Sequence, residues 1–309
     1  MAGILFIISA PSGSGKSTLV SELRRQVSGV EFAISWTTRP PRGSEENGRE
    51  YFFTFREEFQ RMIDAGIFLE HAEVFGHFYG TTRHSLDEAR SDGNDLLLDI
   101  DVQGAAQVRA KMPEAVSIFI MPPNPRVLRT RLRNRSRAEG VVNDEEVYRR
   151  LNASRKEIEN YRQYTYILVN DILDRAVAQL EAIVLAERYY RNGETIAYRS
   201  HRVLEVAAAC LQINSQERLK PVLEAFGIIG ESGQQQLDFG PDPYDDDVDP
   251  DDDEGDPNED EKDTDDDWDA VRLELPQGSG GRPTRTPVAE RFSRSGPQPF
   301  QQGLPHRPG

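Results

Sequence analysis

A ten-residue stretch near the N-terminus, SAPSGSGKST (residues 9–18), constrains the fold of this chain more than any other feature. It follows an apolar run at residues 4–9 and precedes apolar residues at the spacing of one helix face, namely Leu19, Val20, Leu23 and Val27. It matches the phosphate-binding pattern G-x-x-x-x-G-K-[ST], except that Ala10 stands at the first glycine. A glycine-rich loop between a buried strand and a helix points backbone N–H groups and the positive helix end at an anion. The stretch therefore predicts a phosphate-binding loop.

The parts of this loop have distinct expected roles. Gly13 and Gly15 allow the backbone to turn tightly near the ligand. Lys16 is placed to contact the β- and γ-phosphates of a triphosphate, and Ser17 offers its hydroxyl to Mg²⁺. A small residue such as Ala10 suffices at the loop entrance if its φ stays negative; the alternative is a Gly/Ser-rich turn that merely precedes a helix. The expected ATP-binding loop comprises Ala10, Pro11, Ser12, Gly13, Ser14, Gly15, Lys16, Ser17 and Thr18.

Three further apolar runs are separated by stretches of helical character, at residues 95–101, 116–121 and 164–170. Their continuous rather than alternating apolarity predicts strands buried on both faces, as in a parallel sheet covered by helices. The fold class is therefore α/β. Residues 30–94 mix short aromatic runs with Gly and Pro, which indicates an inserted lobe with its own small sheet. Residues 201–213 and 219–229 also have helical character.

Charge is distributed unevenly along the 309 residues. Residues 236–309 hold 7 basic and 21 acidic side chains, a net of −14, whereas residues 1–235 hold 30 basic and 32 acidic ones, a net of −2. The acidic, Pro-rich segment cannot bury enough apolar surface to fold, so it is predicted to be disordered. The near-neutral balance elsewhere argues against a nucleic-acid partner. We expect a domain over 1–195, an extension over 196–235 and a disordered tail over 236–309.

The cysteine content and the N-terminus indicate the compartment. The single cysteine, Cys210, excludes an internal disulfide framework and fits a reducing, intracellular environment. The N-terminal apolar run has about six residues and no basic flank, so it is too short for a signal peptide or a membrane span. We therefore expect a cytoplasmic protein without a membrane partner. The sequence leaves the oligomeric state open.

Two polar groups downstream of the loop suit phosphate and metal binding. Arg39 and Arg42 stand three apart in a Pro-containing loop with Tyr51 after them, a set that can grip a phosphate through forked hydrogen bonds. A solvated basic loop is the alternative. Asp99 and Asp101 alternate at the end of an apolar run, which places both on one face of a strand. In an enzyme with a phosphate-binding loop, an acid at this position can hold Mg²⁺ through water. The alternative is that the two aspartates are only the polar end of a strand.

The chain resembles the guanylate kinase family in four segments that occur in the family's order and at its separations: SAPSGSGKST, SWTTRPPRGSEENGREYFF, FLEHAEVFGHFYGTT and LLLDIDVQGA. The resemblance covers about residues 3–192 and leaves out the acidic tail. It implies a P-loop nucleoside monophosphate kinase that transfers the γ-phosphoryl group of ATP to GMP with Mg²⁺ as cofactor. It also implies a GMP-binding lobe at about 32–94 and a lid at about 130–150. Many bacterial members of the family carry alanine at the loop entrance, so the resemblance implies that Ala10 is an accepted variant.

The resemblance also implies the residues that bind GMP. The positions at which the family binds the GMP phosphate or its surroundings are occupied by Ser35, Arg39, Arg42, Tyr51 and Tyr79. Glu70 and Thr81 fall where the family reads the guanine, although an exposed acid is the usual fate of a glutamate such as Glu70. Asp99 resembles the carboxylate that orients Mg²⁺ through water, and Asp101 is expected to order the GMP side. The division of roles between these two aspartates stays open.

Residues 129–155 are dense with arginine, and two interpretations compete. The segment is either a basic surface for nucleic acid or a lid that closes arginines over the triphosphate. The family places a lid here, which favours the second. Phosphoryl transfer needs positive charge around the moving group, so the expected catalytic residues are Lys16, Arg131, Arg135 and Arg150. Asn170 matches a position near the adenine of ATP, and it is also a suitable N-cap for the next helix.

Other functions remain open at this point. A related P-loop kinase of another small phosphorylated substrate, such as a ribose bisphosphate, would lack the need for Glu70 and Thr81. A non-catalytic guanylate-kinase-like binding module generally has a damaged phosphate loop, whereas the GSGKST motif is intact here. A nucleic-acid-associated protein that uses the lid arginines is disfavoured by the charge balance.

Overall fold

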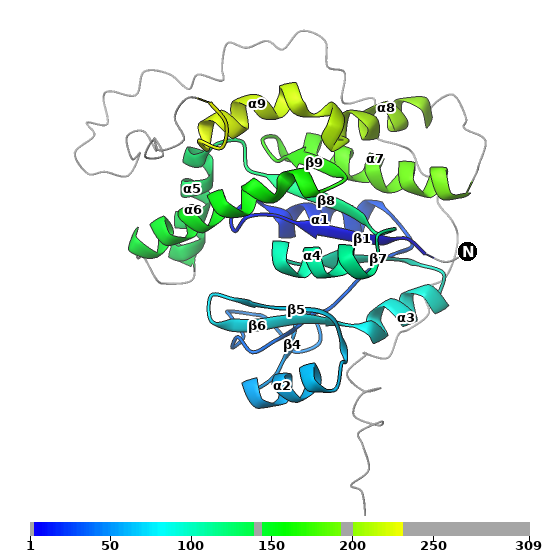
Figure 1. Cartoon of the computed structure of the whole chain (residues 1–309), viewed down its shortest axis with the longest axis vertical. Coiled ribbons are helices and arrows are strands. Elements are labelled where there is room, and N and C mark those ends of the chain that lie inside the picture. Colours follow the sequence, from blue (N-terminus) through cyan, green and yellow to red (C-terminus); the bar gives the residue numbers. More distant parts are fainter. Residues whose placement is uncertain (1–2, 139–143, 193–199, 231–309) are drawn as a thin grey trace, which may run out of the picture.

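The computed structural model describes residues 3–138, 144–192 and 200–230, and its core is a five-stranded sheet (Figure 1). The strand order is β2-β7-β1-β8-β9, and every neighbouring pair is parallel. The strands are β1 (Leu5–Ser9), β2 (Val30–Phe32), β7 (Asp95–Asp99), β8 (Val116–Met121) and β9 (Tyr166–Val169). The α/β class and the strands expected from the continuous apolar runs are confirmed.

Helices cover both faces of this sheet because neighbouring residues of each strand point to opposite faces and most residues of the strands are apolar. Ile8 packs on one face with α1 (Lys16–Gln26), α7 (Leu173–Asn192) and α8 (Ser200–Cys210). Ile7 packs on the other face. The α-helices that contribute to this second cluster are α3 (Arg83–Ser91), α4 (Val102–Lys111), α5 (Pro125–Ala138), α6 (Asp144–Ile158) and α9 (Gln216–Ala225).

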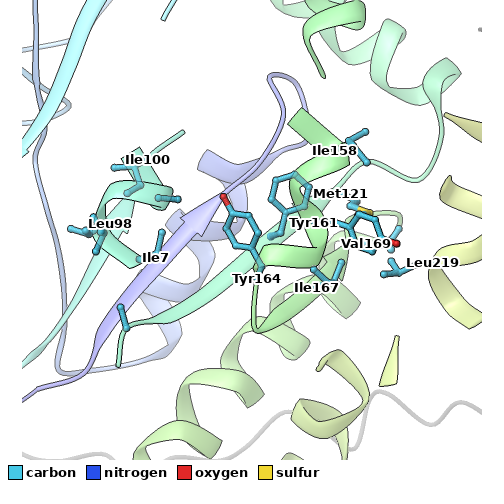
Figure 2. Packing of buried hydrophobic residues seen from close by; sticks show 14 of the residues in the cluster. Ile7, Leu98, Ile100, Met121, Ile158, Tyr161, Tyr164, Ile167, Val169 and Leu219 are labelled. Atoms are coloured by element: carbon cyan, nitrogen blue, oxygen red, sulfur yellow. The ribbon is translucent and has the colours of Figure 1, made fainter. Parts of the chain in front are cut away.

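The second cluster links distant parts of the chain, as Figure 2 shows. Tyr161 and Tyr164 come from the turn between α6 and β9, and they are 2% and 3% exposed. Leu219 of α9 belongs to the same cluster as Ile158 of α6, and it lies near Val169 of β9. Helix α6, which belongs to the lid, therefore shares one apolar cluster with the core sheet and with α9.

The inserted lobe has a four-stranded sheet of its own, drawn below the core in Figure 1. Its order is β4-β3-β6-β5, with β3 (Trp36–Thr37), β4 (Phe52–Phe53), β5 (Phe68–Val74) and β6 (His77–Thr82). Helix α2 (Arg56–Asp64) covers it through Phe59, whose ring lies 4.4 Å from Phe68 and 5.4 Å from Phe78. Helix α3 (Arg83–Ser91) returns the chain to the core. The expected lobe with its own sheet is thus present, over residues 36–82.

The residues beyond the core domain that the structure describes are helical and pack on the core. Arg218 donates to Ile167 O at 2.9 Å, and Arg155 of α6 donates to Gly227 O at 2.7 Å. The expected disordered tail, 236–309, lies outside the described residues, and so does part of the lid, 139–143. Across the described ranges, no helix has the length and apolar character needed to cross a lipid bilayer.

Candidate active site

The phosphate-binding loop has the backbone that the sequence predicted. Gly13 and Gly15 have φ of 86° and 84°, in the left-handed region where a side chain is strained. Gly15 directly precedes α1, so the first N–H groups of this helix face the loop. Phe75 is the only non-glycine residue with positive φ in the described part of the chain, so Ala10 keeps a negative φ. The alanine is therefore compatible with a working loop.

Lys16 begins α1 and points across to the end of β7. Its ammonium forms an ion pair with Asp99 and lies 3.5 Å from Ile100 O. Burial acts to lower the pKa of Lys16, but the charge and hydrogen bond of Asp99 outweigh it, so the pKa is raised. The lysine is therefore a permanent cation beside the phosphate loop.

Two side chains from distant elements hold the loop in place. Asn170, which follows β9, donates from Nδ2 to Ser14 O at 2.8 Å. Arg131 of α5 donates to Asn170 O at 3.0 Å and reaches Ser14 O at 3.4 Å. A Cβ on Gly15 would lie 2.3 Å from Asn170 Nδ2, so only glycine fits at this position. Helix α7 begins at Leu173, so Asn170 secures the loop and is not the N-cap considered above.

The loop, the lobe and the lid line one cleft of about 690 Å³, a volume typical of small-molecule sites. Two expected residues, Arg39 and Thr81, do not line it. The expected residues that do line the cleft are Ala10, Pro11, Ser12, Gly13, Ser14, Gly15, Lys16, Ser17, Thr18, Ser35, Arg42, Tyr51, Glu70, Tyr79, Asp99, Asp101, Arg131, Arg135, Arg150 and Asn170.

The two arginines of the lobe have different surroundings. Arg42 lines the cleft together with Tyr51 and Tyr79. Arg39 is 5% exposed, donates from Nη2 to Glu45 at 2.9 Å and lies 5.3 Å from the centre of the Tyr51 ring. Burial acts to lower the pKa of Arg39, but hydrogen bonds with Glu45 and Tyr79 raise it. In this conformation Arg39 supports the wall of the cleft from behind.

Glu70 is a buried carboxyl group that faces the cleft. It lies on β5 opposite Thr81 of β6, and it is only 2% exposed. Burial raises the pKa of Glu70 to about 7; hydrogen bonds with Thr81 lower it and the nearby Asp101 raises it. The Thr81 hydroxyl also lies 3.1 Å from Ser35 Oγ, a buried pair. Thr81 therefore acts on the cleft through Glu70 and Ser35.

Helix α4 fixes the strand that carries Glu70. Gln107 forms two hydrogen bonds with the backbone of His71, at 3.2 Å and 2.6 Å, and Lys111 donates to Leu69 O. The first turn of α4 is capped by Asp101, whose Oδ1 accepts from Gly104 N at 2.9 Å. The core helix thus holds the backbone on both sides of Glu70.

The lid contributes charge from two helices. Arg131 and Arg135 come from α5, and Arg150 comes from α6. Arg135 is exposed, whereas Arg150 is half-buried and donates to Glu146 Oε1 at 2.9 Å. The three arginines line the same cleft as Lys16, and their catalytic role stays a prediction.

The residues of this site that sequence reasoning missed include Glu157, Glu45 and Gly104. Glu157 lines the cleft and lies seven residues after Arg150, on the same face of α6. Burial raises the pKa of Glu157 to about 7, with Lys16 lowering it and Asp101 raising it. The spacing from Arg150 was the available signal for Glu157. Glu45 pairs with Arg39 within one loop, six residues away, but no residue pattern marked it as the partner. Gly104 could not be recognised as the neighbour of Glu70, because that contact depends on the tertiary fold.

Comparison of the sequence with known proteins points to one family. A family model described as guanylate kinase matches residues 3–187. A guanylate kinase of Koribacter versatilis is 55% identical over 226 residues, which are 73% of this chain and 97% of that protein. A guanylate kinase of Escherichia coli is 45% identical over 188 residues, 60% of this chain and 89% of that protein. A solved guanylate kinase structure from Anaplasma phagocytophilum is 34% identical, covers 60% of this chain and 86% of that chain, and has a TM-score of 0.48.

The chain is a P-loop nucleoside monophosphate kinase, because it combines a parallel core sheet and a phosphate loop with an inserted lobe and an arginine-bearing lid around one cleft. Within this class of enzymes, the chain belongs to the guanylate kinase family.

Proposed function

We propose that this protein transfers the γ-phosphoryl group of ATP to GMP, giving ADP and GDP. The observation that carries the proposal is the position of Glu70, a buried carboxyl group in the same cleft as the phosphate loop. The family match over residues 3–187 and the guanylate kinase relatives support it. They do not favour a sugar-phosphate kinase or a non-catalytic binding module.

Guanine selectivity follows from the chemistry of Glu70. An ionised carboxylate accepts hydrogen bonds from both N1–H and the 2-amino group of guanine, whereas adenine has no donor at N1. With AMP in the cleft, the carboxylate would be desolvated and unpaired. Sites built on such hydrogen bonds reject the wrong ligand by about 10⁴-fold or more. We assign Ser35 and Thr81, which contact each other beside Glu70, to holding the carboxylate in this position.

The GMP phosphate is assigned to Arg42, Tyr51 and Tyr79, which line the cleft. Arg39 lies behind them in an ion pair with Glu45. Reaching the phosphate directly would require Arg39 to leave Glu45, so we assign it to orienting Tyr51 and Tyr79 in the unliganded state. The aromatic hydroxyls and one guanidinium then provide directional donors to a dianion.

The transfer itself needs no covalent enzyme intermediate. An oxygen of the GMP phosphate attacks the γ-phosphorus in line, and the bond from this phosphorus to the oxygen it shares with the β-phosphate breaks. Lys16 and the lid arginines, Arg131, Arg135 and Arg150, surround the moving group with positive charge. Asn170 is assigned to the adenine side of the cleft. Lid closure excludes water that would otherwise hydrolyse ATP.

Mg²⁺ is the cofactor implied by the family, and the oxygen donors of the site fit it. Ser17 provides a hydroxyl at the start of α1, and Asp99 provides a carboxylate in the same cleft, which are donors that a hard cation prefers. The described ranges hold no group of three or more His, Cys, Asp or Glu able to bind a metal. We therefore expect the cation to be held with the ATP phosphates, Ser17 directly and Asp99 through water. When bound, it neutralises charge on the β- and γ-phosphates.

The setting of the reaction is part of the same proposal. A kinase of free nucleotides belongs in purine nucleotide metabolism in the cytoplasm, which agrees with the single buried cysteine. The domain boundary near residue 195 and the disordered tail from 236 also remain proposals. Limited proteolysis tests them: a stable fragment that ends between residues 195 and 235 supports both, and uniform resistance through the tail contradicts them.

The decisive experiment is a coupled assay of ADP formation with ATP and Mg²⁺, comparing GMP, dGMP, AMP, CMP and UMP as acceptors. We expect turnover only with the two guanine nucleotides. Glu70→Gln should lower kcat/KM for GMP by about 10²-fold or more, because one acceptor is replaced by a donor. Glu73→Gln, at an exposed position of the same strand, is the matched control. Equal turnover with AMP and GMP would contradict the proposed specificity.

A further inference from the structure

The tip of the β5–β6 hairpin has an unusual residue. Val74 pairs with His77, so the turn between them consists of two residues, Phe75 and Gly76. Both have positive φ, 50° and 83°. Turns of this kind favour Asn, Asp or Gly at the first position, and a bulky aromatic residue there is strained. Local stability therefore does not account for a phenylalanine at this tip.

The surroundings of Phe75 indicate a function for this residue that accounts for its strained backbone. Its ring is 43% exposed and lines the cleft. Arg149, on lid helix α6, places its guanidinium 5.0 Å from the centre of this ring. This cation–π contact joins the GMP-binding lobe to the lid.

Arg149 is in turn linked to a cleft arginine. It donates to both carboxylate oxygens of Glu146, each at 2.8 Å. Glu146 Oε1 also accepts from Arg150 Nε at 2.9 Å. A continuous set of contacts thus runs from Phe75 at the hairpin tip through Arg149 and Glu146 to Arg150 in the cleft.

We propose that Phe75, Arg149 and Glu146 are positioning residues that set the Arg150 guanidinium for phosphoryl transfer when the hairpin and the lid are in contact. This inference rests on the proposed function and deepens it. An exposed cation–π contact is weak, about a two- to fivefold effect on an equilibrium, which suits a contact that must break for product release. This set of contacts, called the relay below, favours lid closure only when the GMP-binding lobe has moved onto the lid. It thereby couples the motion of the lobe to that of the lid.

The first test uses a substitution that separates function from stability. Phe75→Asn removes the ring and introduces a residue that the turn prefers, so Tm should stay or rise by up to about 3 °C. The kcat should fall about two- to fivefold, with KM for ATP within twofold of the wild type. Phe75→Tyr keeps a ring and should retain kcat. A fall in Tm with unchanged kcat would mean that Phe75 only shapes the hairpin and would overturn the proposal.

A double-mutant cycle tests the relay. Arg149→Met keeps the side-chain length but removes the cation, and it should lower kcat at least as much as Phe75→Asn. In the double variant the loss should match that of Arg149→Met alone, because removing the guanidinium already breaks its contact with the Phe75 ring. Tyr148→Leu is the matched control: it removes a cation–π contact with Arg129, at 5.7 Å, that lies within the lid. Losses that multiply, or an equal loss in the control, would overturn the proposal.

A distance measurement separates failure of the relay from failure of the proposed function. Spin labels on Gln60→Cys in α2 and Asn152→Cys in α6 report the separation of lobe and lid, and the native Cys210 is fully buried. Without nucleotides, Phe75→Asn and Arg149→Met should each lengthen this distance. If the wild type fails to phosphorylate GMP, the proposed function is wrong. The distance measurement then tests the contact between Phe75 and Arg149 independently of activity. An unchanged distance in both variants would show that no such contact holds the two parts together.

Discussion

Gly104 lies directly beneath the carboxyl group of Glu70, so closely that a Cβ on Gly104 would be 2.3 Å from Glu70 Oε2. Gly104 is in the first turn of α4, in the core domain, and Glu70 is on β5, in the inserted lobe. The absence of one side chain thus allows the carboxyl group of Glu70, to which we assign the reading of guanine, to lie against a core helix. This helix also forms hydrogen bonds with the backbone on either side of Glu70.

Gly104→Ala is therefore expected to displace Glu70 and weaken GMP binding by about 10-fold or more, whereas ATP binding changes by less than twofold. A methyl group at 2.3 Å from an oxygen forces the carboxyl group or the strand to shift. Calorimetric titration with each nucleotide measures the two affinities. Ala106→Ser, at an exposed position of the same helix, controls for effects on α4 itself. Unchanged GMP affinity in Gly104→Ala would show that the contact is not needed.

The raised pKa of Glu70 predicts a pH-dependent stability. Burial raises this pKa from 4.5 to about 7, so between these values the folded protein keeps a proton that the unfolded chain has lost. The free energy of unfolding therefore falls as pH rises through this window, by about 3 kcal/mol in all. Glu70→Gln removes this loss. Its stability relative to the wild type should rise by a few kcal/mol between pH 5 and pH 8, as measured by urea denaturation.

Glu73→Gln provides the comparison for this pH series. Glu73 lies on the same strand but is exposed, in an ion pair with Arg56 at 3.3 Å. Its effect should stay within about 1 kcal/mol at both pH values, as expected for a surface pair. A pH-independent difference between Glu70→Gln and the wild type would show that Glu70 titrates near its ordinary value.

Lys16→Met is expected to lower kcat by at least about 10²-fold while the fold is retained. The ammonium is the fixed charge beside the phosphate loop, and methionine has a similar length without charge. The partner Asp99 is partly exposed, so solvent can hydrate it once the lysine is gone. Circular dichroism and the coupled assay measure fold and turnover. Retention of most of the rate would refute the role assigned to Lys16.

The loop and the core sheet were predictable from sequence because their signals are local. Gly13 and Gly15 are needed by the backbone itself, and continuous apolar runs suffice to indicate strands buried on both faces. Strand β2 was not predicted, because its three residues are too few to form a pattern and it is recognised only by pairing with β7.

Most of the residues expected in the site line the cleft, but the residues that support them were not predictable. Arg42 and Glu70 were found because the motifs that carry them resemble a family. The contact of Gly104 with Glu70, and that between Phe75 and Arg149, depend on how separate segments meet in space. Sequence spacing does not encode such meetings.

The carboxyl group of Glu157 lies in a cleft that must accept two phosphorylated ligands, so its charge affects their binding. Burial raises the pKa of Glu157 to about 7, so the group is mainly neutral below this pH and mainly charged above it. The charged form repels the phosphates and competes for Lys16. Glu157→Gln imitates the neutral form at every pH, so its kcat/KM for GMP relative to the wild type should rise as pH increases from 6 to 8.5.

Rate measurements across this pH range, with Glu159→Gln as an exposed control near the same helix end, distinguish three outcomes. A ratio that rises through about pH 7 supports repulsion by the ionised carboxylate. A flat ratio shows that Glu157 does not titrate in this range. A falling ratio contradicts the prediction, because it means that the ionised carboxylate assists the reaction. Glu157 would then act in its charged state, as Lys16 and the lid arginines are proposed to do.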